Sequence, residues 1–415
     1  FRENENIPPY LFMSIIVALF IGLSVSAEEI FRDRKILKRE AFLNLSRSSY
    51  LFSKIAILFA ISAIQTLCFV LIGNSFLGIK GLYLEYWALL LSVSFFANIL
   101  GLNISSAFNS AVSIYILIPL LVIPQMILGG AMFSFDKLNS AIGGGNSKTP
   151  IIADVMVSRW AYEALAVTQF KNSRYGAEFY ESDRMESIAN YKQAFYIPEL
   201  KKIVKETRSF IMEGGDSSQT ELEGNISLLR KELEAEEMIV QQPGFEQPGL
   251  LLADPVDHPS LDSVDVYLEA LNESYISLFN TVNRNRDQHL LSLEKGTERN
   301  DTYNSLYDDH YNDFLGDVVK KTGISHPVVR GKSGLIQIID PIFRYPEVKA
   351  NPFRSHFFAP VKYLAGFRME TFYFNLLVIW TFSFLLYVTL YFDALRRLLT
   401  LFGKIQRRWM KQHNN

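Results

Sequence analysis

The chain has 415 residues, a formal net charge of −2 and one cysteine, Cys68, so no disulfide within the chain can stabilise it. Residues 131–370 hold 35 acidic and 26 basic side chains, a net charge of −9, and the long apolar runs lie outside them. This division excludes a single soluble globular domain and predicts a membrane protein that carries an acidic, soluble-type insertion.

The apolar runs set the fold class. A helix needs about 20 apolar residues to cross the hydrocarbon core of a bilayer, and five runs are of about that length or longer. They cover residues 9–27, 51–78, 84–108, 111–130 and 371–392. We therefore predict a mainly α fold, a polytopic helical membrane domain with a large, mostly helical extracytoplasmic insertion before the last span.

A highly charged block, residues 28–50, separates the first two runs. It carries six Lys or Arg residues, and the tail after Tyr391 carries six more. Positive charge close to membrane ends faces the cytoplasm, so both segments are expected inside the cell. Alternation of the spans then puts residues 131–370 outside.

The fourth run contains Pro119 and Pro124. Proline removes a backbone donor and bends a helix, and the bend is either a harmless kink or a gate that flexes. Farther along, Gly143 to Thr149 invites comparison with a phosphate-binding loop. That loop needs glycine immediately before its lysine, whereas serine precedes Lys148. We interpret the stretch as a link.

Periodic apolar residues predict helices in the insertion. Residues 174–212 have mixed charge and many tyrosines and are expected to be helical. Two further stretches repeat apolar residues at alternating spacings of four and three, which is typical of a helix seam. The seam residues are Leu222, Ile226, Leu229 and Leu233, then Val264, Leu268, Leu271, Tyr275, Leu278 and Val282. A proline-rich connector, 241–260, separates them and predicts an antiparallel helical hairpin. Residues 356–370 are expected to lie on the outer surface as an amphipathic stretch.

The insertion has no recognisable catalytic or metal-binding motif. Its histidines are scattered, and the nearest approach to a cluster, Asp308-Asp309-His310, is more typical of a solvated helix face. We assign no catalytic residue, metal ligand or cofactor to the chain. Binding or docking is the expected role of the insertion, and no nucleic acid partner is expected.

Two separated motifs, together with the order of the spans, resemble one family. The first runs from Asp33 to Glu40 (DRKILKRE), with Tyr50 and Lys54 at the start of the next span. The second comprises PQMILGGAMF from Pro124 and SRWAYEAL from Ser158. The combination resembles the membrane region of G-subfamily ABC transporters, of the White and pleiotropic drug resistance type. In that family the first motif belongs to a cytoplasmic coupling helix, and SRWAYEAL resembles part of an external re-entrant segment.

The resemblance implies a division of the chain into parts. These are membrane spans in 1–130 with the coupling helix at 28–50, the re-entrant segment 131–170, an extracytoplasmic helical domain 171–370, the last span 371–393 and a basic cytoplasmic tail 394–415. Compared with the family, the first transmembrane helix and the nucleotide-binding domain are missing from the chain, and the outer loop is far longer. These departures suggest a bacterial inner-membrane protein with residues 131–370 in the periplasm.

The resemblance also implies roles for single residues. On the coupling helix, those expected to meet the ATPase are Asp33, Arg34, Lys38, Arg39 and Glu40. Those expected to line a substrate path are Met13, Ile16, Phe20, Ile123, Met126 and Ile127, with Ala131 and Met132 as an apolar plug above it. Without the resemblance, the charged block would be a loop that only orients helices, and each apolar residue would be ordinary packing.

The expected function is that of the permease part of an ATP-driven ABC exporter, which moves an apolar or amphipathic substrate by alternating access as a homodimer. An ABC ATPase, in the same polypeptide or in a separate subunit, would bind ATP and Mg and supply the ATPase activity. Membrane lipid and a periplasmic protein are further expected partners. The alternative is a membrane-anchored sensor or scaffold whose outer domain binds a ligand or a protein without transport. ATPase motifs upstream of Phe1, or in a partner subunit, would discriminate the two.

Overall fold

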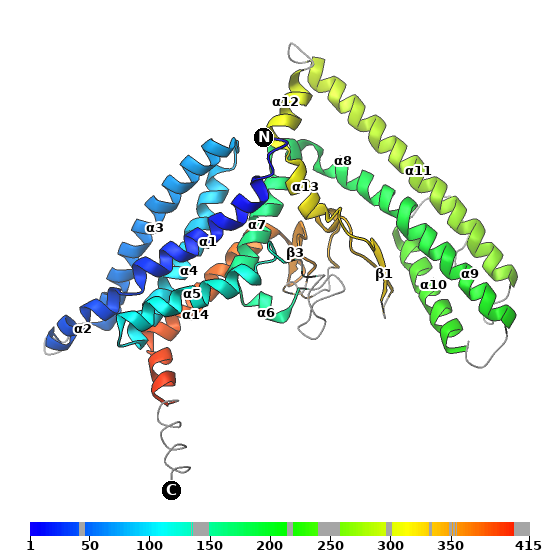
Figure 1. Ribbon diagram of the computed structural model, residues 1–415. Helices are drawn as coiled ribbons and strands as arrows, with labels where there is room; N and C mark the ends of the chain where they lie inside the picture. Colours follow the sequence, from blue (N-terminus) through cyan, green and yellow to red (C-terminus); the bar gives the residue numbers. More distant parts are fainter. Residues whose placement is uncertain are drawn as a thin grey trace, which may run out of the picture. The chain divides into compact units, whose positions relative to one another are not determined.

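The computed structural model describes residues 1–40, 46–133, 135, 149–213, 219–239, 258–295, 301–331, 334–347, 351, 353 and 355–401. The chain divides into two compact units (Figure 1). The membrane unit comprises Phe1–Gly176, Tyr307–Val319 and Tyr345–Asn415, and the insertion unit comprises Ala177–Leu306 and Lys320–Arg344. The predicted link at 143–148, the connector up to residue 257 and the tail from residue 402 lie outside the described residues.

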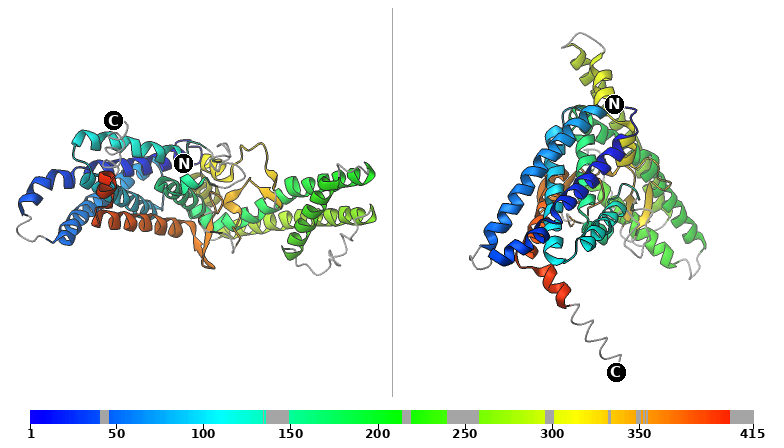
Figure 2. Two further views of the ribbon diagram at one scale, coloured as in Figure 1. Left: turned by 90° about the horizontal axis from the view of Figure 1, so that it is seen from below. Right: turned by 60° about the vertical axis from the view of Figure 1, so that its left-hand side comes forward.

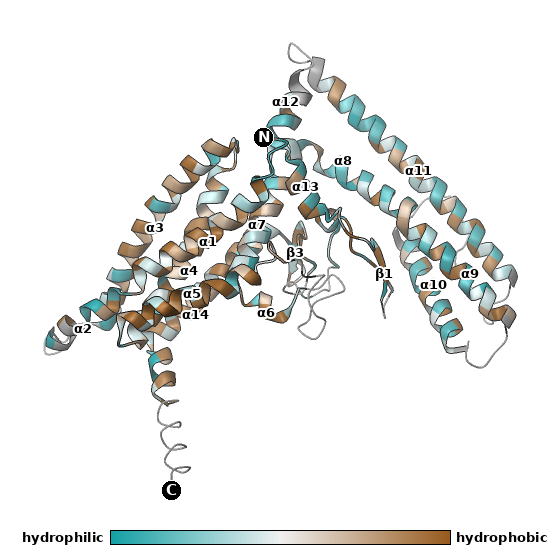
Figure 3. Ribbon diagram, viewed as in Figure 1, coloured by the Kyte–Doolittle hydropathy of each residue, from teal (hydrophilic) through white to brown (hydrophobic). Residues whose placement is uncertain are grey.

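Apolar helices lie over the five predicted runs. They are α1 (Ile7–Ser26), α3 (Arg47–Leu77), α4 (Tyr83–Ala107), α5 (Ala111–Ile127) and α14 (Thr371–Tyr391). Of these five helices, four are long and apolar enough to cross a membrane, whereas α5, with 17 residues, is shorter. Colouring by hydropathy distinguishes these helices from those of the insertion unit (Figure 3). The mainly α, polytopic fold class is confirmed.

Helix α4 forms the centre of the membrane unit, and α1, α3 and α14 pack against it (Figure 2). Most of α4 is buried, including the polar residues Asn98 and Asn103. Small residues allow α1 to approach closely, since a methyl group on Gly22 would lie 2.7 Å from the Cβ of Ala97. Close packing of this kind holds membrane helices together, because lipid chains are as apolar as the side chains themselves.

Two further helices follow α5. They are α6 (Ile151–Asp154) and α7 (Val157–Lys171), which lie in the predicted re-entrant segment. Helix α7 is buried from Val157 to Phe170 and packs against α1, α4, α5 and α14. It is therefore an internal helix of the membrane unit, enclosed by the spans.

An antiparallel hairpin leads into α14. Its strands are β3 (Val361–Leu364) and β4 (Phe367–Glu370). Both turn residues, Ala365 and Gly366, have positive φ, as a type I′ hairpin turn requires. The prediction of an amphipathic surface stretch over 356–370 is wrong in this respect. Phe357 and Lys362 are buried, because the base of the hairpin packs into the membrane unit and Lys362 finds a carboxylate there.

Residues 307–319 also belong to the membrane unit. They include the end of α12 (Asp301–His310) and most of α13 (Asp313–Lys320). The side-chain amide of Asn312 donates to the carbonyl oxygens of Phe1, Arg2 and Asn4 at 2.9–3.1 Å. The compact insertion unit therefore contains fewer residues than the predicted domain 171–370.

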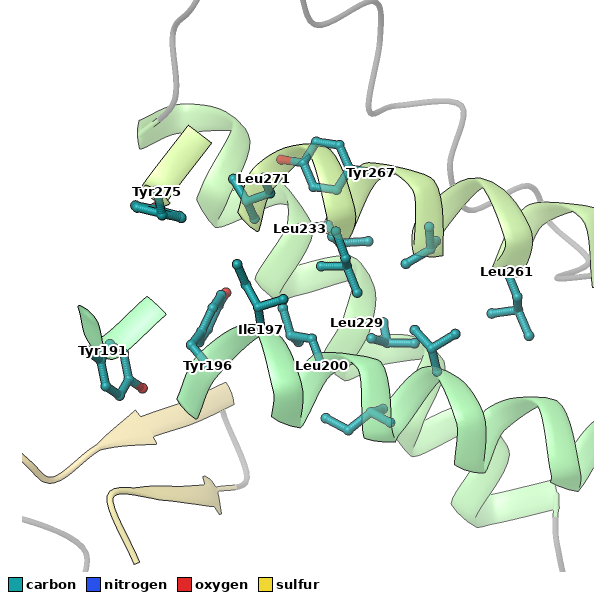
Figure 4. Packing of buried hydrophobic residues seen from close by; sticks show 14 of the residues in the cluster. Tyr191, Tyr196, Ile197, Leu200, Leu229, Leu233, Leu261, Tyr267, Leu271 and Tyr275 are labelled. Carbon is teal, nitrogen blue, oxygen red and sulfur yellow. The ribbon is translucent and has the colours of Figure 1, made fainter. Parts of the chain in front are cut away.

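The insertion unit is also mainly helical. Its elements are α8 (Arg174–Tyr191), the π-helix η4 (Lys192–Tyr196), α9 (Ile197–Glu213), α10 (Gln219–Ile239), α11 (His258–Lys295), an antiparallel pair β1 (Val328–Gly331) and β2 (Gly334–Gln337), and the 3₁₀-helix η7 (Pro341–Phe343). Leu271 of α11 and Leu229 of α10 are fully buried, as the two seams predict (Figure 4). Leu268 of α11 is fully buried as well. Helix α9 also contributes an apolar face, with Leu200 and Ile203. It packs against both seams, so the predicted two-helix hairpin is a three-helix assembly.

Candidate functional site

The charged block forms a helix, α2 (Glu29–Glu40), that is fixed to the end of α4. The guanidinium of Arg34 donates to the carbonyl oxygens of Ser105, Ser106 and Phe108 at 3.2, 2.9 and 3.0 Å, and also to Asn109. The last carbonyls of a helix have no partner within it and carry partial negative charge. Arginine suits this position because its planar fork presents several donors at fixed angles.

A second set of contacts ties α2 to the start of α3. The ammonium of Lys54 lies 2.7 Å from carboxylate oxygens of both Glu29 and Asp33. The hydroxyl of Tyr50 donates to Asp33 at 3.1 Å. The ammonium and both carboxylates are about one-fifth exposed, so water screens these pairs less than it would on an open surface. Helix α2 is therefore docked on α3 and α4 rather than being a free loop.

The five predicted coupling residues thus divide by environment. Asp33 and Arg34 point to partners within the membrane unit. Arg39 is exposed and lies in the distal half of α2, together with the exposed Ile36. The side chains of Lys38 and Glu40 lie outside the described set. Among the coupling residues whose side chains the structure describes, Arg39 is the exposed one and is open to a partner.

The residues predicted to line the substrate path also differ in their exposure. Met13 and Phe20 on α1, and Ile123 and Ile127 on α5, are 42–50% exposed. Ile16 is buried, and Met126 is partly buried. The plug residues Ala131 and Met132 are exposed. Helices α1 and α5 pack together, with Ile114, Ile118 and Val122 on the buried face of α5. The structure therefore brings the two predicted rows onto neighbouring helices and leaves most of both open.

The kinked helix α5 is joined to α7 by a pair of hydrogen bonds. The side-chain oxygen of Gln125 accepts from the backbone N–H of Ser158 at 3.0 Å, and the Ser158 hydroxyl donates to the Gln125 carbonyl at 2.6 Å. The first bond satisfies an N–H at the start of α7, and the second a carbonyl at the end of α5. The two stretches of the second motif, which begin at Pro124 and at Ser158, therefore meet.

A buried polar cluster lies in the membrane unit, where β3, α7 and α14 meet, and sequence reasoning missed it. Lys362 on β3 places its ammonium 2.6 Å from Glu163 on α7 and 3.1 Å from Asn375 on α14, and both charged side chains are 0% exposed. Asn375 also donates to Glu163 and to the carbonyl of Trp160. Arg159 is fully buried, 3.9 Å from Glu163, with its guanidinium over the Trp160 ring.

The electrostatics of this cluster follow from burial and charge. Burial raises the pKa of Glu163, but Lys362 and Arg159 outweigh it, and the pKa lies below its ordinary value. Burial lowers the pKa of Lys362 to about 8, although Glu163 acts in the opposite direction. Among the described residues, the Nε and Nη1 of Arg159 and the Oε1 of Glu163 have no hydrogen-bond partner. The one sequence signal was a lone lysine in the apolar run before α14.

The insertion unit has a polar cluster of its own at the π-helix η4. Lys192 pairs with Glu236, whose other carboxylate oxygen accepts from the hydroxyl of Tyr275 at 2.7 Å. Glu232 accepts from the hydroxyl of Tyr196 at 2.8 Å and from the backbone N–H of Leu335 at 2.7 Å. Burial lowers the pKa of Lys192, against the effect of Glu236. The cluster therefore connects η4, α10, α11 and β2.

The two aspartates of the Asp308-Asp309-His310 motif form ion pairs. Asp308 pairs with Arg2 and Asp309 with Lys80, all within the membrane unit. His310 is mostly buried, and burial lowers its pKa. Among the described residues, no group of three or more His, Cys, Asp or Glu side chains could hold a metal ion.

The fold and the contacts of α2 together define the class of protein. The protein is a polytopic α-helical membrane protein whose charged helix α2 is docked on the ends of its spans. Residues 2–170 match the family model of the ABC-2 type transporter. The match supports an ABC-2 permease domain, and so a permease component of an ABC transporter, in which such domains work with an ATPase partner. Neither the curated proteins nor the solved structures provided a match.

Proposed function

We propose that the protein is the permease of an ATP-driven exporter, in which α2 transmits ATPase movement to the membrane helices. The docking of Arg34 on the end of α4 carries this proposal. A charged segment that only sets the orientation of the spans needs no such contacts. A helix that transmits movement must be attached to the membrane helices that it moves. Arg34 provides the attachment to α4, and Lys54 provides it to α3.

The ATPase would then meet the distal half of α2, where Arg39 and Ile36 are exposed. ATP and Mg would bind in that ATPase, outside the chain described here. Closure of the ATPase pair would push α2, and α2 would move α3 and α4 with it. The family resemblance supports a G-subfamily arrangement, a homodimer, and release on the outer face of a bacterial inner membrane.

The cargo would be an apolar or amphipathic molecule. The exposed rows on α1 and α5, Met13, Phe20, Ile123 and Ile127, would face a cavity shared with a second copy. Ala131 and Met132 would close the cavity above. The insertion unit, with its own core, would receive cargo or dock a periplasmic protein.

The coupling proposal can be tested by cross-linking in the complete transporter with its ATPase. In a Cys68→Ser background, a cysteine replacing Arg39 should cross-link to the ATPase, whereas a cysteine replacing Asn285 of the insertion unit should not. Arg39→Glu should weaken co-purification of the ATPase. A cysteine at position 39 that never reaches an ATPase, in a chain that co-purifies with none, would favour the sensor or scaffold.

Docking and transmission can be separated by a second variant. Arg34→Lys keeps the charge but loses the planar fork that reaches several carbonyls. We expect it to retain the ATPase and its basal hydrolysis while reducing the response of the permease to nucleotide. The readout is the nucleotide-dependent change in a spin-label distance between α1 and α5. An unchanged response would remove Arg34 from the transmission path.

A further inference from the structure

A small cleft lies among α1, α3 and α4, on a face of α1 next to the one that carries Met13 and Phe20. Its volume is about 20 Å³, room for roughly one water-sized group. It is lined by Ser14, Val17, Ala18, Ile21, Gln65, Thr66, Phe69, Leu90 and Ser94. Four of these side chains are polar, and none is charged.

The cleft lies deep in the membrane. Gln65 follows the ion-paired Lys54 by eleven residues of continuous helix, about 16 Å at 1.5 Å per residue. The hydrocarbon core is about 30 Å thick, so Gln65 lies near its middle. Water is scarce at this depth, and polar groups there need partners from protein or ligand.

The three hydroxyl groups of the cleft donate hydrogen bonds within the protein, and their oxygens can still accept one. Ser14 donates to the carbonyl of Leu11 at 2.8 Å, Thr66 to that of Ser62 at 2.7 Å, and Ser94 to the hydroxyl of Ser62 at 3.0 Å. A hydroxyl oxygen that donates its proton still accepts. The three oxygens therefore favour a ligand that carries a donor.

Gln65 adds a group that can both donate and accept. It is exposed on α3 and has no hydrogen-bond partner among the described residues. Two further polar atoms along α3 have no hydrogen-bond partner among the described residues. They are Asn98 Oδ1, at the contact of α3 with α4, and Asn74 Nδ2, at the contact of α3 with α1. An exposed amide in the middle of a span is unfavourable unless something polar occupies the space beside it.

We propose that this cleft binds the hydroxyl group of a neutral amphiphile whose apolar body lies in the bilayer along α3. The absence of any charged side chain in the lining disfavours phosphate or carboxylate headgroups. The exposed Ile61 and Ile72, on the same face of α3 as Gln65, offer contact for the apolar body. This site is separate from the α1–α5 path and does not depend on an ATPase.

The test uses the purified full chain in lipid nanodiscs and three photoreactive probes of equal chain length. One ends in a hydroxyl, one in a methyl ether and one in a carboxylate. The alcohol should label peptides of α1, α3 and α4 saturably, and unlabelled long-chain alcohol should compete. The ether accepts but cannot donate, so its affinity should be about tenfold lower, the effect of losing one hydrogen bond.

Two variants and one control assign the labelling to the cleft. Gln65→Leu and Ser94→Ala should each reduce alcohol labelling several-fold. Thr381→Val removes an exposed hydroxyl of α14, outside the cleft, and should leave it unchanged. Equal labelling by all three probes, or full labelling of Gln65→Leu, would overturn the proposal and leave a cleft that holds water. Because no ATPase is present, failure of the exporter proposal would not alter this result.

Discussion

Lys362 connects three elements of the membrane unit through its side chain. Its ammonium is fully buried, yet it contacts α7 through Glu163 and α14 through Asn375. A buried charge is tolerated only where a partner and further hydrogen bonds replace water. The pair therefore holds the hairpin, the internal helix and the last span in one arrangement. Ser158, which also lies on α7, forms its hydrogen bonds with Gln125 of α5.

Removing one partner of this pair should be costly. Glu163→Gln leaves the ammonium of Lys362 buried without a counter-charge, and we expect a loss of about 3–5 kcal/mol. The measurement is unfolding of the purified chain in detergent. Glu370→Gln, which removes a half-exposed partner of Lys171, is the matched control and should change little. Combining Glu163→Gln with Lys362→Met should restore much of the loss; a double variant as unstable as the single one would contradict this account.

The pair also predicts a pH dependence. The pKa of Lys362 is about 8 in the folded chain against 10.5 when unperturbed. Between these values the unfolded chain holds a proton that the folded chain has released, so this residue makes stability rise with pH. The slope is at most about 1.4 kcal/mol per pH unit.

The measurement compares stability from pH 7 to 10.5 in the native chain and in the Glu163→Gln, Lys362→Met double variant. Titration of other groups is common to both and cancels in the difference. The free energy of unfolding of the native chain, relative to that of the double variant, should increase as pH rises. Parallel curves would show that Lys362 keeps its proton throughout this range.

At the scale of elements, the sequence predicts the seams of the insertion unit correctly but not the structure of residues 356–370. The α10 and α11 seams were correctly read because a period of 3.5 residues marks the buried face of a helix. Residues 356–370 were misread because their apolar residues face a protein interior that the sequence does not display. The local signal for a hairpin in this segment is the Ala365-Gly366 pair, which forms the turn.

The three-helix core of the insertion unit gives a direct test. Leu268→Ala removes a fully buried side chain between α9 and α11 and should cost about 2–5 kcal/mol. Val266→Ala, two residues away and 72% exposed, should be nearly neutral. Hydrogen exchange of the amides in α9, α10 and α11 is the measurement. Equal protection in both variants would mean that this face of α11 does not hold the unit together.

At the scale of the whole molecule, the main question is on which side of the membrane the insertion unit lies. Basic residues at 28–50 and beyond Tyr391 predict that both segments are cytoplasmic and the unit is outside. In a Cys68→Ser background, a cysteine replacing the exposed Asn285 should react with an impermeant thiol reagent in intact cells. A cysteine replacing the exposed Ser48, at the start of α3, should react only after lysis. The reverse labelling pattern would contradict the predicted topology and place the insertion unit in the cytoplasm.

What the sequence determined alone was local: the apolar lengths that define spans, the basic clusters that predict orientation, and the periods of the insertion helices. Each is read within a few turns of one segment. The tertiary structure decided which groups meet across long separations. Lys362 lies 199 residues from Glu163, and Arg34 lies 72 residues from the carbonyl of Ser106. Such contacts depend on how helices pack, because a buried charge selects its partner by position in space. The charged block at 28–50 was visible in the sequence, but only packing distinguished the inward Arg34 from the exposed Arg39.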